Sequence, residues 1–412
     1  MKFTPINSRR EAVFDALQQC RSRTLDLFSG IDSETLSCQA HADFSPVGWH
    51  LGHIAYTEGY WILERCAGLP PKFPQYHQLF DADGLPKSER QHLPPLEEIR
   101  DYVDAVRTEI LTYLETAPLE KQERLWQWLI QHESQHSETI TLILQLQRAS
   151  AAELYHPTTN KQSSPLSTEM VKIPAGEFYM GSNEGAQDNE RPAHRIHLDT
   201  YWIDCYPVTC EQYREFIAAG GYQNRRWWSE EGWQWLQSHP VAQPLYWWNS
   251  PDWDQHPVCG VSWYEAQAYA RFVGKRLPTE AEWEKAASWD EAAGCKHSYP
   301  WGEVPPSAKT CNHDTLVGHT TPANAYPAGQ SAYGCYDMLG NVWEWTASWF
   351  DGYEGFKRYP YRGYSQVYFD NQHRVLRGGS WATRPWALRA SWRNWYYPSV
   401  RQILAGFRCV SE

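Results

Sequence analysis

The chain has 412 residues, of which 42% are hydrophobic and 21% charged, and it carries a formal net charge of −12. This composition excludes a disordered or fibrous protein, and the net negative charge gives no support to nucleic-acid binding, which needs a basic surface. No stretch resembles a membrane helix or a signal peptide, and the ten scattered cysteines form no C-x-x-C pair, so we expect a cytoplasmic protein with reduced thiols.

The first 150 residues are predicted to form an up-down bundle of four helices. The predicted helices cover residues 8–28, 46–66, 96–115 and 119–148. Pro46 follows Ser45, which is typical of a helix cap followed by a proline in the first turn. The segment 67–95 is rich in proline and polar residues, so we expect a long loop with a functional role.

A polar, aperiodic segment over residues 151–168 is predicted to be a linker. Beyond it, short β-like runs alternate with glycine, proline and aromatic clusters, and helices are predicted only over 210–219, 262–273 and 279–288. The sequence therefore predicts an α+β protein of two domains, with a helical bundle at 1–150 and an irregular α+β domain at 169–412.

Histidines spaced by one helical turn indicate a metal site in the bundle. His132 and His136 lie at i and i+4 in the string HESQHSE, so both rings leave one face of the predicted helix. The string also reads HExxH, which is typical of a zinc hydrolase with Glu133 as general base, but no H-x-x-G-x-x-H extension follows. The upstream helix offers His50 or His53 as a third ligand.

Three imidazoles leave open positions on a bound metal ion. Zn²⁺ in such a site would activate water, whereas Fe²⁺ could bind organic ligands and O₂. The spacing of the histidines does not decide between the two metals.

Two segments of the bundle resemble the DinB-like domain of the iron-dependent sulfoxide synthases of ergothioneine biosynthesis, the hercynine oxygenases. They are DFSPVGWHLGHIAYT at 43–57 and QHESQHSET at 131–139. The second half is similar to the formylglycine-generating-enzyme-like domain. The matching motifs are IPAGEFYMGS at 173–182, HPVCGVSWYEAQAYARFVGKRLPTEAEWEKAA at 256–287, DMLGNVWEWTAS at 337–348, RVLRGGSWAT at 374–383 and AGFRC at 405–409. The resemblance covers nearly the whole chain, in the same order of domains.

This resemblance implies a non-haem iron(II) enzyme that uses O₂ to join hercynine, which is N-trimethylhistidine, to a thiol such as cysteine or γ-glutamylcysteine. His53, His132 and His136 match the three iron ligands of the family. Gln135 matches a residue that holds the substrate carboxylate.

The resemblance also assigns substrate residues in the second domain. Asn394 and Trp395 belong to an R-N-W motif that lines the hercynine pocket, where aromatic faces suit a quaternary ammonium group. Segment 359–364 resembles the loop of active-site tyrosines. It implies that Tyr361, or else Tyr364, gives a hydrogen bond or proton to bound oxygen.

The residues expected to bind the thiol depart from the family pattern. Tyr396 replaces an aspartate of the relatives that use γ-glutamylcysteine, and the loop offers Lys87 and Arg90 where those relatives have two arginines. These three residues are predicted to bind the donor, which could be cysteine, another thiol, or a selenosugar as in the related selenoneine synthases.

The second domain is expected to form the substrate pocket and not to generate formylglycine. That copper-dependent chemistry needs two cysteines near the end of the domain, and only Cys409 lies there. A structural Ca²⁺ is a further expectation, near residues 341–344.

Overall fold

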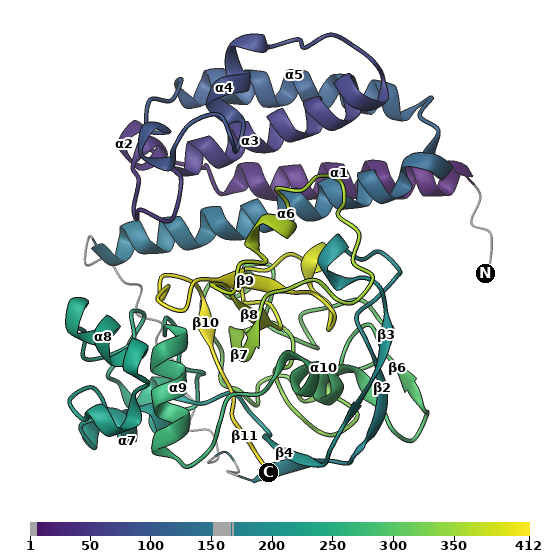
Figure 1. The fold of residues 1–412 in the computed structure, drawn as a ribbon. Helices are drawn as coiled ribbons and strands as arrows, with labels where there is room; N and C mark the ends of the chain where they lie inside the picture. Colours follow the sequence, from purple (N-terminus) through teal and green to yellow (C-terminus); the bar gives the residue numbers. More distant parts are fainter. Residues whose placement is uncertain (1–5, 151–165, 167–168) are drawn as a thin grey trace. The chain divides into compact units, whose positions relative to one another are not determined.

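The computed structural model describes residues 6–150, residue 166 and residues 169–412 (Figure 1). The chain divides into two compact units, Met1–His156 and Pro157–Glu412, which are treated separately below. The linker predicted at 151–168 lies outside the described residues except for Leu166. Within the described ranges, no helix is both long and apolar enough to span a bilayer.

The first unit contains the four predicted helices. They are α1 (Ile6–Asp26), α3 (Val47–Glu58) with its continuation as the π-helix η1 (Gly59–Cys66), α5 (Leu96–Leu114) and α6 (Leu119–Ser150). Helix α3 packs against both α5 and α6, and α1 packs against α6 (Figure 1). Pro46 precedes the first residue of α3 and does not lie within its first turn.

The predicted long loop contains short helical turns that the sequence analysis did not predict. They are η2 (Pro74–Tyr76), α4 (His77–Phe80) and η3 (Lys87–Glu89), and another short helix, α2 (Ser33–Ser37), precedes α3. Phe80, the last residue of α4, is fully buried. Its ring lies against Gly52 of α3, where a Cβ atom would come within 2.2 Å of it. The missing side chain at Gly52 therefore lets this loop pack directly on α3.

Four buried charges connect the four long helices of this unit. Nε of Arg21 lies 2.8 Å from Glu133, and Nη2 of Arg21 lies 3.0 Å from Glu58. Arg107 binds the same two carboxylates, with its Nη2 2.9 Å from Glu133. All four side chains are at most 6% exposed. We call this set, one residue from each of α1, α3, α5 and α6, the charge quartet.

The second unit is built from small sheets. One has the antiparallel order β1-β4-β11 (Met170–Ile173, Tyr201–Asp204, Val410–Ser411). Another has the order β10-β7-β8-β9 (Ala405–Gly406, Trp343–Trp349, Arg374–Arg377, Asn394–Tyr396), in which only the pair of β10 and β7 is parallel. Two antiparallel pairs complete the described strands, β2 with β3 (Gly176–Met180, His194–Leu198) and β5 with β6 (Trp289–Asp290, Cys295–Lys296).

The three helices predicted in the second half are present as α7 (Cys210–Ala218), α9 (Trp263–Phe272) and α10 (Glu280–Ser288). Each begins with a capping box, in which a Ser or Thr and a Gln or Glu three residues later bind each other's backbone N–H groups. Helix α8 (Glu230–Ser238) was not predicted. Its segment includes a glycine and two tryptophans, which weaken the helical signal, and the Ser229 side chain caps its first turn.

Candidate metal centre and substrate residues

Three histidines of the first unit converge on one point. His53 comes from α3, and His132 and His136 lie one turn apart on α6; their ligating nitrogens all lie within 4.8 Å of one another. Nε2 of His132 is 3.1 Å from Nε2 of His136. The structure thus brings together the three residues that the resemblance assigned to iron, and His53, not His50, completes the group.

Neighbouring groups fix how His53 is oriented. Its Nδ1 lies 2.7 Å from the backbone carbonyl oxygen of Phe80, which can only accept, so Nδ1 carries the proton. Nε2 therefore has the lone pair, which faces the Thr57 hydroxyl at 3.4 Å. The His53 ring also stacks on Trp49, with ring centres 4.6 Å apart. A ligating imidazole is usually held in this way by its second nitrogen.

The protonation of these histidines suits a metal site. Burial lowers the pKa of His53 to about 4 and lowers the pKa values of His132 and His136 well below the usual value. All three rings are therefore neutral near pH 7, which is the form that binds a metal ion.

The spacing of the nitrogens also fits one ion. Two nitrogens bound at about 2.0–2.1 Å lie about 2.8–3.4 Å apart when the angle at the metal is between a right angle and the tetrahedral value. The 3.1 Å between His132 and His136 falls inside this range. The donor set of three imidazoles is one that both Zn²⁺ and Fe²⁺ accept.

His50 lies beside the group without joining it. Its Nδ1 is 2.8 Å from Nδ1 of His136, the ring nitrogen on the side away from His132. His50 is buried, and burial lowers its pKa well below the usual value.

Glu133, the glutamate of the HExxH string, belongs to the charge quartet. Burial alone would raise the pKa of this carboxyl, but the guanidinium groups of Arg21 and Arg107 outweigh that effect and hold it below its usual range. The side chain is fully buried and binds both arginines. A carboxylate held in this way does not suit the general base of a zinc hydrolase, which must face the metal-bound water.

The two loop residues predicted to bind the thiol make contacts within the first unit. The Arg90 guanidinium lies over the Trp49 ring at 4.0 Å and donates to the Leu85 carbonyl at 2.9 Å. Nζ of Lys87 donates to the backbone carbonyl of Asp43 at 2.6 Å. These contacts hold the loop beside α3, and a role of Lys87 and Arg90 in donor binding stays a prediction.

In the second unit, Trp395 is the centre of an aromatic cluster. Its ring stacks on Phe350 at 4.2 Å, meets Tyr364 edge-on at 6.3 Å and lies 5.5 Å from Tyr368. The preceding Asn394 side chain accepts the N–H of Trp395 at 2.9 Å. The predicted substrate residue Trp395 and the predicted catalytic residue Tyr364 therefore share one cluster, and Asn394 and Tyr396 flank Trp395 on strand β9.

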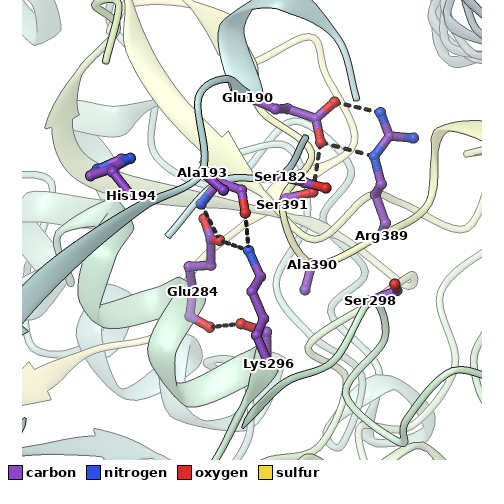
Figure 2. A network of polar contacts seen from close by, with 12 residues as sticks. Ser182, Glu190, Ala193, His194, Glu284, Lys296, Ser298, Arg389, Ala390 and Ser391 are labelled. Carbon is purple, nitrogen blue, oxygen red and sulfur yellow. Dashed lines mark hydrogen bonds and ion pairs between the residues drawn. The ribbon is translucent and has the colours of Figure 1, made fainter. Parts of the chain in front are cut away.

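A buried turn, η4 (Asp188–Glu190), supports this cluster and was not singled out from the sequence. The Asp188 carboxylate accepts the backbone N–H of Tyr359 at 3.1 Å, and the Asn189 carbonyl accepts from Arg393 at 2.7 Å. Glu190 accepts from Arg389 and Ser391, as Figure 2 shows. The turn thus fixes both the tyrosine segment and the chain that leads into β9.

Arg393, the arginine of the R-N-W motif, has a structural role. Its guanidinium forms two bonds of 2.9 Å to the Glu280 carboxylate at the start of α10, and both groups are buried. It also lies over the rings of Phe350 and Tyr353. Arg393 therefore orients the motif, and its neighbours Asn394 and Trp395 are only partly buried.

The two candidate tyrosines differ in exposure. Tyr364 is 8% exposed, and its burial, together with Asp188 and Glu190, raises the pKa of its phenol well above the usual value. It therefore keeps its proton at neutral pH. Tyr361 is partly exposed and packs over Gly363, where a Cβ atom would lie 2.7 Å from its ring.

The side chains near the expected calcium position make other contacts. Glu344 binds Arg408 through two bonds of 2.7 Å, and Asn341 donates to the Thr321 carbonyl and to Asp337. The calcium site stays a prediction with no support from these contacts.

Cys409 is the cysteine near the end of the second domain. Burial raises the pKa of its thiol well above the usual value, so the thiol stays protonated.

Comparisons with known proteins match both units. Residues 156–412 match the family described as "Sulfatase-modifying factor enzyme 1-like domain", and residues 16–140 match the DinB superfamily. A protein from Mycolicibacterium smegmatis named hercynine oxygenase is 38% identical over 97% of this chain and 98% of its own length. A second hercynine oxygenase, from Mycobacterium tuberculosis, is 39% identical over 95% of this chain and 96% of its own. A formylglycine-generating enzyme from Thermomonospora curvata is 36% identical over 44% of this chain and 71% of its own length.

Proposed function

Because the chain belongs to the hercynine oxygenase family of oxidoreductases, we propose that it uses iron(II) and O₂ to join hercynine to a thiol as a sulfoxide. The observation that carries the metal part of this proposal is the convergence of three neutral imidazoles, two of them buried and that of His136 partly buried, with two Nε2 atoms 3.1 Å apart.

The overall reaction balances without an added reductant. The C2–H bond of the hercynine imidazole and the S–H bond of the thiol break, and a C–S bond forms. One atom of O₂ ends on sulfur and the other leaves as water with the two hydrogens. The two substrates supply all four electrons that reduce O₂.

His53, His132 and His136 would hold the metal. Iron(II) bound there supplies open positions for substrate and O₂ and the redox chemistry of the reaction. The protein contributes rigidity: the Phe80 carbonyl and the Trp49 ring hold His53, and the charge quartet ties α3 to α6. The ligands are therefore arranged before any metal arrives.

Hercynine carries a carboxylate and a trimethylammonium group, and each has an assigned partner. We assign the carboxylate to the amide of Gln135, which can donate to it, and Asn394 to the lining of the hercynine pocket, as the resemblance implies. The ammonium group would lie against Trp395, because a cation over an aromatic face gains about 0.5–2 kcal/mol. The packing of Phe350 against this ring supports the assignment, since it fixes the plane of the indole.

A phenol supplies the hydrogen bond or proton that oxygen reduction requires. Tyr361 is our first choice, because it is partly exposed, and the buried Tyr364 is the second. The raised pKa of Tyr364 keeps it a donor throughout the physiological pH range.

The residues on the donor side of the site depart most from the family pattern. Tyr396 and Lys87 replace groups that anchor γ-glutamylcysteine in relatives, which favours a different thiol such as cysteine or a selenium donor such as a selenosugar. Protein loaded anaerobically with iron is to be given hercynine, O₂ and each of these three donors in parallel. Mass spectrometry then identifies which donor, if any, becomes attached to hercynine.

A ligand variant with a matched control tests the metal site. His132→Ala should bind less iron and lose turnover, whereas His77→Ala, in the same unit and paired with Glu64, should keep both. Full iron content and activity in His132→Ala would refute the assignment. Zinc in place of iron, with hydrolysis independent of O₂, would instead support the zinc hydrolase suggested by the HExxH string.

A further inference from the structure

His50 contacts a predicted metal ligand, yet neither the family resemblance nor the His132–His136 spacing gives it a role. Its Nδ1 lies 2.8 Å from Nδ1 of His136, and its ring is buried against Trp49, with ring centres 5.3 Å apart. Both histidines are held by long helices, α3 and α6, so the contact is part of the packing between those helices.

The position of the protons follows from this geometry. Two ring nitrogens 2.8 Å apart share one hydrogen, so one nitrogen donates and the other accepts. A neutral imidazole has a single N–H, and His136 can ligate through Nε2 only if that hydrogen is on Nδ1. His136 must then be the donor, and Nδ1 of His50 must be the acceptor.

We propose that His50 is a positioning residue, which accepts the Nδ1–H of His136 and thereby fixes the tautomer and the ring angle with which His136 meets the metal. This inference rests on the proposed metal site. The Phe80 carbonyl gives His53 the same support. The two acceptors differ in one respect. A backbone carbonyl can only accept, whereas an imidazole accepts at Nδ1 in only one of its two neutral tautomers. The tautomer of His50 and metal binding by His136 are therefore coupled.

Two substitutions separate the acceptor from the volume of the ring. In His50→Asn, Oδ1 takes nearly the place of the ring Nδ1 and can accept the same hydrogen. In His50→Leu the acceptor is lost while an apolar side chain of useful size remains. Loss of such a partner of a ligating histidine typically weakens metal binding about 10–100-fold.

The probe is Co²⁺ alone, titrated into the full-length, metal-free protein without substrate. Absorption of the bound ion gives the affinity. Proton NMR of the Co²⁺-loaded protein shows the exchangeable Nδ1–H resonances of the ligands as separate shifted signals. We expect His50→Leu to bind Co²⁺ about 10–100-fold more weakly and to lose one of these signals. His50→Asn should stay within a few-fold of the native protein and keep the signal.

The outcomes distinguish the two hypotheses. If the native protein binds no Co²⁺, the metal site itself is wrong. If it binds, and His50→Leu binds equally well with every Nδ1–H signal intact, only the role of His50 is overturned. Should His50→Leu fail to fold, His50→Gln replaces it, since its carboxamide reaches the place of Nε2 and leaves Nδ1 of His136 without an acceptor. Equal affinities of the Gln and Asn variants would then also overturn the inference.

Discussion

Replacing Glu133 by glutamine should destabilise the first unit. Glu133 is fully buried and accepts from Arg21 at 2.8 Å and from Arg107 at 2.9 Å. The charge quartet contains two arginines and two glutamates and is therefore neutral. The substitution leaves two guanidinium groups with the single carboxylate of Glu58, so one positive charge stays buried without a partner.

The size of the effect follows from burial. Removing one member of a buried ion pair costs about 3–5 kcal/mol, because the remaining charge keeps its desolvation penalty. The total stability of a domain is about 5–15 kcal/mol, so the loss is a large share of it. The matched control is Glu123→Gln on the same helix, since Glu123 pairs with Arg9 at 3.5 Å and is 42% exposed. Exposed pairs contribute about 0–1 kcal/mol.

Urea unfolding followed by far-ultraviolet circular dichroism measures both variants. A double variant that also carries Arg21→Gln restores neutrality, and we expect it to be less destabilised than the sum of the two single variants. A Glu133→Gln protein within about 1 kcal/mol of the native stability would refute the reasoning. If Glu133→Gln kept the native stability but lost an O₂-independent hydrolysis, Glu133 would instead be a catalytic base.

Three other predictions test other parts of the structure. Gly52→Ala would place a methyl group 2.2 Å from the Phe80 ring, so it should cost about 1–3 kcal/mol in urea unfolding and weaken Co²⁺ binding; Gly59→Ala, with its nearest contact at 3.6 Å, should be tolerated. Burial raises the pKa of Asp337 to about 7, so the native protein loses stability as pH rises from about 4 to 7. Asp337→Asn removes this loss, and its advantage should grow by about 1.4 kcal/mol per pH unit in that range; a constant difference would contradict it. Trp395→Leu should weaken hercynine binding in calorimetry about 2–30-fold, but should weaken the binding of imidazolepropionate, which lacks the ammonium group, very little; equal losses would exclude a contact with the ammonium group.

The four long helices of the first unit could be predicted because their signals are local. Apolar spacing located α5 and α6 to within two residues, and the interval between His132 and His136 placed both rings on one face. The support of His53 could not be predicted in this way. It comes from a backbone carbonyl, that of Phe80, and every residue has one, so no sequence pattern marks it. What the sequence does show is Gly52, whose missing side chain lets the Phe80 ring approach.

The HExxH string shows why a short motif does not determine its own chemistry. The spacing of its histidines requires only a helix, and that part of the prediction depends on nothing else in the chain. The function of the glutamate depends on the groups that face it from other helices. Here they are Arg21 and Arg107, 112 and 26 residues away along the chain, and they bind the carboxylate that a hydrolase would leave free for water. In this chain the HExxH string therefore supplies two candidate metal ligands, His132 and His136, and a glutamate that belongs to a structural ion pair.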